Sequence, residues 1–133
     1  MEIFTGLRSP LAISLGAISG ALVRYYLTLW FSQRFIGFPW GTGVINLSGC
    51  FLIGIVTAIA PGRWSPEVRL MVTTGFLGAY TTFSTYELET VMLMRNKGME
   101  ALLYGLGSAV LGVVCVLLGM RLGELMGGAR PGG

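Results

Sequence analysis

The chain has 133 residues, of which 53% are apolar and 11% are charged, and its formal net charge is +3. A soluble domain carries about a quarter charged residues, so this chain has too few polar side chains to cover a water-facing surface. Its Lys and Arg residues form no clustered basic run, which argues against nucleic acid as a partner. The absence of His removes the commonest acid/base catalyst and metal ligand.

Four long apolar segments predict an all-α integral membrane protein with a single transmembrane domain over residues 1–133. A bilayer core of roughly 30 Å needs about 20 apolar residues in a helix. In chain order, we expect helices over 9–32, 41–60, 67–94 and 99–125. Glycine pairs four residues apart, Gly16 with Gly20 and Gly119 with Gly123, indicate that some of these helices pack closely.

The positive charges are divided almost evenly between the two ends of the predicted helices. The side with both termini holds Arg8, Arg63, Arg69, Arg121 and Arg130. The opposite side holds Arg34, Arg95 and Lys97, with Arg24 reaching toward it. Because orientation follows the Lys and Arg bias of short loops, this weak bias permits insertion in both orientations and hence an antiparallel homodimer. A weakly oriented monomeric bundle fits the same charge map.

The third segment is not an ordinary helix. Over 73–86 it reads TTGFLGAYTTFSTY, and seven of these fourteen positions are Gly or Thr, which are poor helix formers. Non-helical backbone persists at membrane depth only where protein or a water-filled cavity covers it, and its free carbonyl and amide groups form intramembrane ion sites. We therefore expect a break near 75–82. The alternative is a Gly/Thr packing face whose hydroxyls bond to their own helix.

Other polar and aromatic side chains fall at similar depths and outline a polar track beside this break. Asn46 lies a third of the way into the second helix, where its amide needs a partner. Tyr104 and Ser108 lie four residues apart on one face of the last helix. Phe83 and Tyr86 add ring edges, whose partial positive charge solvates an anion. Taken singly, each is explained by an interhelical hydrogen bond or by core packing; together they favour an anion pathway.

A motif in the third segment, GFLGAYTTFSTYELE, resembles the signature of the Fluc/CrcB family of fluoride channels. Gly41, Thr42 and Asn46 resemble the family's GTxxxN segment, and Arg24 matches an arginine late in its first helix. The resemblance covers essentially the whole chain. It implies an antiparallel, dual-topology homodimer of four-helix subunits in the bacterial inner membrane. Its two pores would export cytoplasmic fluoride passively and so confer fluoride resistance.

The resemblance also implies a structural sodium ion at the centre of the dimer. Main-chain carbonyls of Gly78 and Thr81 from both subunits would bind it, and oxygen ligands suit such a hard cation. The implied fluoride path is lined by Asn46, Phe83, Ser84, Thr85, Tyr86, Tyr104 and Ser108.

The sequence departs from the family pattern at a few positions. Tyr86 stands where a second Phe is usual, so its hydroxyl either donates to fluoride or hydrogen-bonds elsewhere. Gly112 stands where some members carry a further hydroxyl. Glu89 matches a family glutamate just beyond the motif, whereas Glu87 is an additional acid without an assigned role.

Two other functions compete with a fluoride channel. A small dual-topology, proton-coupled multidrug exporter would also have four helices, but it needs a titratable carboxylate deep in a span, and the first predicted helix has none. A non-transporting subunit of a larger membrane complex is the second alternative, and transport by the purified protein separates it from a channel. An enzyme is not expected, because the sequence offers no nucleophile or paired-carboxylate constellation.

Overall fold

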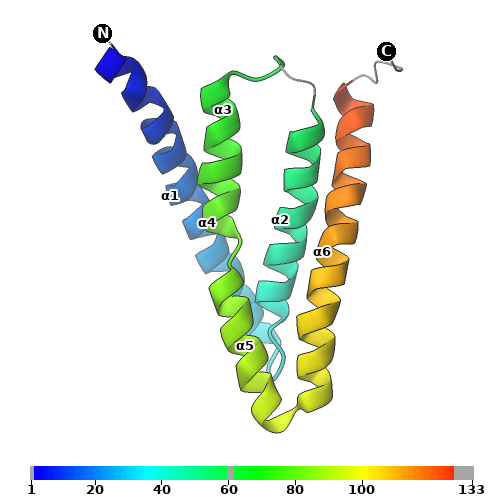
Figure 1. Ribbon diagram of the computed structural model, residues 1–133. Coiled ribbons are helices and arrows are strands. Elements are labelled where there is room, and N and C mark those ends of the chain that lie inside the picture. Colours follow the sequence, from blue (N-terminus) through cyan, green and yellow to red (C-terminus); the bar gives the residue numbers. More distant parts are fainter. Residues whose placement is uncertain (1, 60–61, 128–133) are drawn as a thin grey trace.

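The computed structural model describes residues 2–59 and 62–127, and the regular elements in this part of the chain are all helices (Figure 1). They are α1 (Glu2–Arg34), α2 (Trp40–Ala58), α3 (Pro66–Leu70), the π-helix η1 (Met71–Leu77), α4 (Gly78–Tyr80), α5 (Phe83–Asn96) and α6 (Gly98–Gly127). The first and last of these extend beyond the predicted ranges at both ends. The predicted helix end at 60, the outer ends of the predicted domain and Arg130 lie outside the described residues.

Three helical stretches are long and apolar enough to cross a membrane: Gly6–Arg34, Trp40–Ala58 and Gly98–Gly127. Many of their large apolar side chains point outward, as do Leu15 and Leu103, which suits a hydrocarbon surrounding. These features confirm the prediction of an all-helical, multi-pass membrane protein. Between α2 and α6 the chain is helical in shorter pieces, so a fourth crossing built from these pieces stays a prediction.

Local sequence explains how the interrupted segment begins. Ser65 caps α3, because its hydroxyl accepts a hydrogen bond from the Val68 N–H at 3.3 Å, and Pro66 occupies the first turn. The helix then widens into η1, which contains Thr73, Thr74 and Gly75. Weak helix formers at this point permit the wider turn, and π-helical turns are frequent at functional sites.

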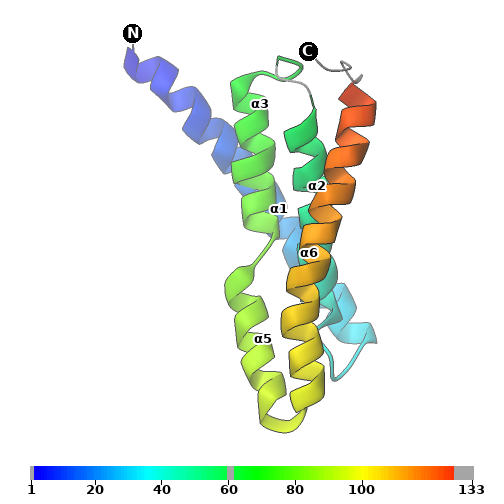
Figure 2. The same ribbon diagram turned by 45° about the vertical axis from the view of Figure 1, so that its right-hand side comes forward.

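Close glycine contacts join the helices in two pairs, α1 with η1 and α2 with α6. The ribbon of α2 runs beside that of α6 in both views (Figures 1 and 2). A Cβ atom at Gly16 of α1 would collide with the Met71 carbonyl oxygen. A Cβ atom at Gly119 of α6 would collide with the Phe51 carbonyl oxygen of α2. The second glycine of each predicted pair makes the same kind of approach to the opposite backbone. The structure thus confirms the close packing expected from both pairs.

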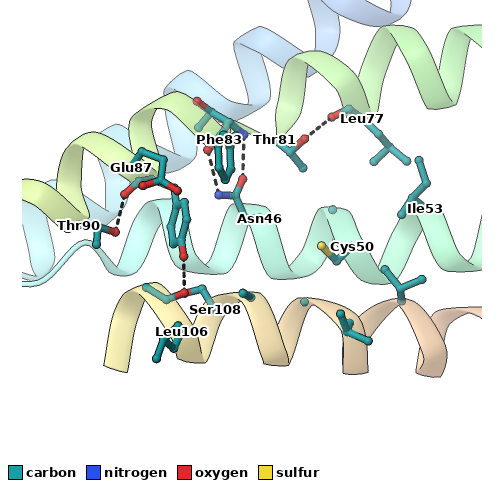
Figure 3. A pocket seen from close by; sticks show the side chains of 18 of the residues that line it. Asn46, Cys50, Ile53, Leu77, Thr81, Phe83, Glu87, Thr90, Leu106 and Ser108 are labelled. Atoms are coloured by element: carbon teal, nitrogen blue, oxygen red, sulfur yellow. Dashed lines mark hydrogen bonds between the residues drawn. The ribbon is translucent and has the colours of Figure 1, made fainter. Parts of the chain in front are cut away.

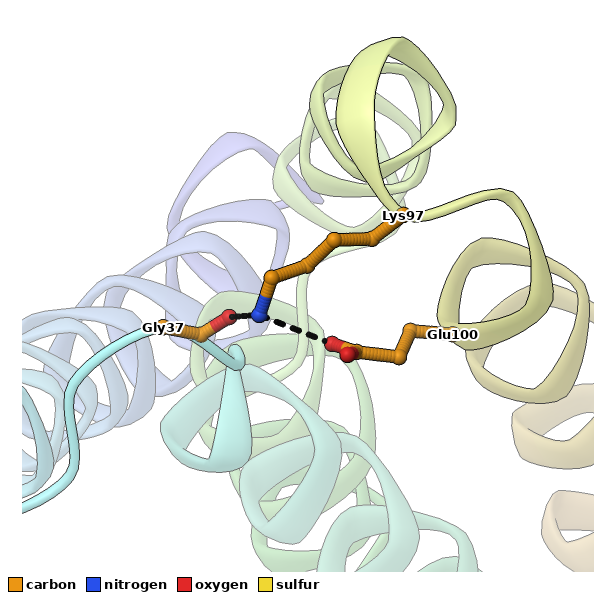
Figure 4. Close-up of polar contacts among 3 residues, drawn as sticks. All are labelled: Gly37, Lys97 and Glu100. Carbon is orange, nitrogen blue, oxygen red and sulfur yellow. Dashed lines mark hydrogen bonds and ion pairs between the residues drawn. The ribbon is translucent and has the colours of Figure 1, made fainter.

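Polar contacts tie both ends of the bundle. At one end, Lys97 Nζ donates to the Gly37 carbonyl oxygen and to Glu100 Oε2, both at 3.1 Å (Figure 4). At the other end, Arg63 donates to the Met126 carbonyl oxygen at 2.7 Å. Met126 lies in the last turn of α6, where carbonyl groups lack intrahelical partners and a positive charge complements the helix dipole. The loops are therefore held against the helix ends.

Replacing Gly119 with Ala is expected to lower the thermal unfolding midpoint of the purified protein in detergent. The added methyl group collides with the Phe51 carbonyl, and such overpacking costs about 1–3 kcal/mol. Gly107→Ala is the matched control on the same helix, because its Cβ position has no neighbour within 4 Å beyond the adjacent backbone of α6 and Ala is the better helix former. Equal midpoints for the two variants would contradict the close approach of α2 and α6.

Candidate ion pathway

The interrupted segment breaks at Thr81 and Thr82, between α4 and α5 (Figure 1). Both residues have extended backbone conformations, with φ of −83° and ψ of 155° at Thr81 and φ of −148° and ψ of 111° at Thr82. The break falls at the end of the range where the sequence predicts it. Extended backbone at this depth leaves peptide groups without helical partners, so each of them needs another one.

Asn46 on α2 supplies that partner for Thr82. The Thr82 N–H donates to Asn46 Oδ1 at 2.8 Å, and Asn46 Nδ2 donates to the Thr82 carbonyl oxygen at 3.1 Å (Figure 3). The side-chain amide therefore pairs with both polar groups of one residue, as a neighbouring peptide would. Because the Thr82 N–H points to Asn46, it does not bond the Gly78 carbonyl four residues earlier, as it would in a continuous helix.

Gly49 leaves room on α2 for the side chain of Thr81, the other residue of the break. It lies three positions after Asn46, on the same face of α2. A Cβ atom there would collide with Thr81 Cγ2, so only glycine lets the Thr81 side chain approach. The Thr81 hydroxyl donates to the Leu77 carbonyl oxygen at 2.9 Å and closes the end of α4. Sequence reasoning missed Gly49, although its spacing from Asn46 is a usable signal.

Thr82 also starts the next helix. Its hydroxyl accepts a hydrogen bond from the Thr85 N–H at 3.3 Å and donates to the Thr85 hydroxyl at 2.9 Å. This is an N-cap of the usual kind, and it fixes the direction in which α5 leaves the break. The N–H groups of the first turn, which includes Phe83 and Ser84, have no intrahelical acceptor and favour negative charge nearby.

A groove of about 980 Å³ runs along the break between α5 and α6, with α2 at its base (Figure 3). It is lined by four of the predicted fluoride-path residues and by both predicted sodium ligands, namely Asn46, Phe83, Tyr86, Ser108, Gly78 and Thr81. The remaining predicted path residues, Ser84, Thr85 and Tyr104, lie outside its lining. The Phe83 ring is 73% exposed, so it is available to whatever fills the groove.

The Tyr86 hydroxyl makes a hydrogen bond to the backbone of α6. It donates to the Gly105 carbonyl oxygen, while the ring lies 5.8 Å from that of Phe83 and 5.2 Å from that of Tyr104, measured between centroids. The sequence left open whether this hydroxyl meets fluoride or bonds elsewhere. The structure shows the second arrangement, and the ring of Tyr86 stays at the groove wall.

The Glu89 carboxylate accepts hydrogen bonds from two hydroxyl groups on a side away from the groove. Thr42 donates to Glu89 Oε1 and Tyr104 donates to Glu89 Oε2, each at 2.8 Å. Both donors are buried, with 3% of each residue exposed. These bonds replace water around the carboxylate, which would otherwise be costly to bury. Thr42 carries a role that sequence reasoning did not assign, although it stands in the quoted GTxxxN segment.

Arg24 lies apart from the break and the groove. Arg24 is half-buried on α1, does not line the groove, and has no hydrogen bond or ion pair to another described residue.

The described part of the chain contains no group of three or more Cys, Asp or Glu side chains that could hold a metal ion. A main-chain oxygen is available at the break, because the Gly78 carbonyl loses its helical donor when the Thr82 N–H bonds Asn46.

Comparison with known families decides the relationship of this chain. A family model described as CrcB-like protein, Camphor Resistance (CrcB), matches residues 11–120. The chain belongs to the CrcB family. This confirms the resemblance seen in the motif of the interrupted segment.

Members of the CrcB family from several bacteria are closely similar over nearly their whole length. A fluoride-specific ion channel FluC of Trichormus variabilis is 52% identical over 91% of this chain and 92% of its own. The FluC of a Synechococcus strain is 50% identical over 90% and 95%, and that of Chloroflexus aurantiacus is 44% identical over 89% and 97%. These relatives are named as channels, which supports the expectation that the chain is not an enzyme.

Replacing Asn46 with Leu is expected to destabilise the protein strongly. Both polar groups of Thr82 lose their partner, and each unsatisfied group costs about 1–3 kcal/mol. Asn46→Asp keeps an acceptor for the Thr82 N–H but no donor for its carbonyl, so it should lie between wild type and Asn46→Leu. Thermal unfolding midpoints in detergent give the order. An Asn46→Leu protein as stable as wild type would show that the break does not depend on this pair.

Replacing Tyr86 with Phe is expected to cost about 0.5–1.5 kcal/mol of stability, because the hydrogen bond between α5 and α6 is lost while the ring remains. The measurement is a reversible unfolding titration of the purified protein. Tyr26→Phe is the matched control, since Tyr26 is 64% exposed on α1 and should be neutral. Equal effects of the two substitutions would contradict a specific role for the Tyr86 hydroxyl.

Proposed function

We propose that this protein is a fluoride-selective channel that exports cytoplasmic fluoride passively across the bacterial inner membrane. The observation that carries the proposal is its similarity to proteins named fluoride-specific ion channels, at 44–52% identity over about nine-tenths of this chain. The geometry supports it, because a membrane protein with a polar break beside a groove has the features that ion passage requires.

Fluoride holds its water tightly, so a path for it must replace that water with other donors. Asn46 Nδ2 uses one N–H for the Thr82 carbonyl and has a second N–H available beside the groove. The Ser108 hydroxyl lies across the groove on α6. The exposed Phe83 ring offers a partially positive edge, and the first turn of α5 adds unpaired N–H groups. None of these groups holds an anion by full charge, so fluoride can also leave.

The functional unit in this proposal is an antiparallel homodimer. A groove with a broken helix in its wall cannot face lipid, because its peptide groups need protein or water around them. A second copy in the opposite orientation would cover the groove, and the near balance of positive charge between the two sides permits that orientation. The pieces from α3 to α5 then form the fourth crossing, with the break at its centre.

A sodium ion at the centre of this dimer fits the residues present. Main-chain carbonyls of Gly78 and Thr81 from the two copies would hold it, and both residues line the exposed groove. Hard cations prefer such oxygen ligands. The ion would supply a fixed positive charge that holds the two breaks together. Asn46, which redirects the Thr82 N–H away from the Gly78 carbonyl, keeps that oxygen free.

The direct test is fluoride efflux from liposomes that contain the purified protein, read with a fluoride electrode at neutral pH, with chloride efflux measured in parallel. A channel releases fluoride without a proton gradient and retains chloride. Release that needs a proton gradient would favour the multidrug exporter instead. No release from a well-folded dimer would overturn the proposal and favour a subunit of a larger complex.

Replacing Phe83 with Ile is expected to abolish fluoride efflux in this assay while the protein elutes from size-exclusion chromatography as wild type does. Ile retains bulk but has no ring edge to solvate the anion. Val110→Ile is the control, because Val110 is 64% exposed on α6 and does not line the groove. Unchanged efflux from Phe83→Ile would remove the aromatic edge from the mechanism.

A further inference from the structure

Glu87 lies on the groove face of α5. The groove-lining residues of this helix recur at spacings of three and four, which places them on one face: Phe83, Tyr86, Glu87, Thr90 and Met94. Glu87 is one turn beyond Phe83, roughly 6 Å along the helix axis. Its side chain is exposed in the single chain, and Figure 3 shows it beside the groove together with Phe83 and Asn46.

Among the described residues that line the groove, Glu87 carries the only charged side chain. The α2 residues that line the groove, Asn46, Gly49, Cys50 and Ile53, are all uncharged, and the α6 wall is apolar apart from Ser108. Its carboxylate has no cationic partner within the described chain, where the one ion pair joins Lys97 to Glu100 at an end of the bundle (Figure 4). Its charge is therefore not compensated by any described group of the same chain.

An uncompensated carboxylate beside an anion path has a predictable effect. Like charges repel, and water screens them less in a groove with apolar walls than in bulk solvent. Conduction requires that binding be favourable enough for the ion to enter the path, and a repelling carboxylate makes entry less favourable.

We propose that Glu87 is a throughput-determining residue: its carboxylate lowers the occupancy of the groove by fluoride and so limits the rate of conduction. This inference rests on the proposed fluoride channel. It separates Glu87 from Glu89, whose carboxylate is turned away from the groove toward Thr42 and Tyr104.

The test is a charge series at position 87, measured as fluoride efflux from liposomes at neutral pH and low ionic strength. Glu87→Gln keeps the shape and removes the charge, and it should raise efflux roughly 2- to 10-fold. Glu87→Asp keeps the charge and should stay close to wild type. Glu124→Gln makes the same change on an exposed part of α6 outside the groove and should have no effect.

Salt dependence distinguishes electrostatics from an effect on packing. The Debye length falls from about 30 Å at 0.01 M to about 8 Å at 0.15 M salt, so an impermeant salt should raise wild-type efflux and shrink the gain in Glu87→Gln. The wild-type measurement decides the matter even if the variant does not fold.

The outcomes separate this inference from the function on which it rests. Wild-type protein that releases no fluoride would overturn both. Wild-type protein that conducts, with Glu87→Gln equal to it or slower, would overturn the role of Glu87 and leave the channel standing. Wild-type efflux that is independent of salt would also overturn the role of Glu87 and leave the channel standing.

Discussion

The pairing of the Asn46 amide with the backbone of Thr82 is the interaction on which the rest of this structure depends. A helix that opens within a membrane protein exposes peptide groups that hydrocarbon cannot satisfy, and this side chain satisfies the donor and the acceptor of one residue at once. With that partner in place, the Gly78 carbonyl is released and Thr82 is free to cap α5. One amide on α2 thus creates the free oxygen and the new helix start that an ion site can use.

Helix packing positions this amide accurately. Backbone-to-backbone approach at Gly119 holds α2 against α6, and the same kind of approach at Gly16 holds α1 against η1. Gly49 then lets Thr81 dock on α2 beside Asn46. Because the contacts at Gly119 and Gly16 are made by backbone atoms, the spacing of these helix pairs cannot relax by a change of rotamer. These packing contacts set the shape of the groove between α5 and α6.

The break is predictable from the sequence, because Gly and Thr in an apolar segment contradict a continuous helix, and a lone amide such as Asn46 demands a partner. The apolar lining of the groove is not predictable in the same way, because it depends on how the helices pack. The sequence does not predict which group pairs with the Asn46 amide, since that depends on how two helices approach each other. For the same reason the Tyr86 hydroxyl has two candidate partners in the sequence and one in the structure, the Gly105 carbonyl. Tyr104 was grouped with Ser108 by spacing alone, and its hydroxyl in fact reaches Glu89. The predicted roles of these residues toward fluoride stay predictions.

The most direct test of the central claim is the hydrogen-exchange rate of the Thr82 amide, measured residue by residue on the protein in lipid nanodiscs. Thr82 belongs to no helix, and the acceptor of its N–H is Asn46 Oδ1, so that bond is expected to protect the amide. Slow exchange, comparable to that of amides in the middle of α2, is the predicted result. Exchange as fast as that of an exposed loop amide would show that Asn46 does not hold the break.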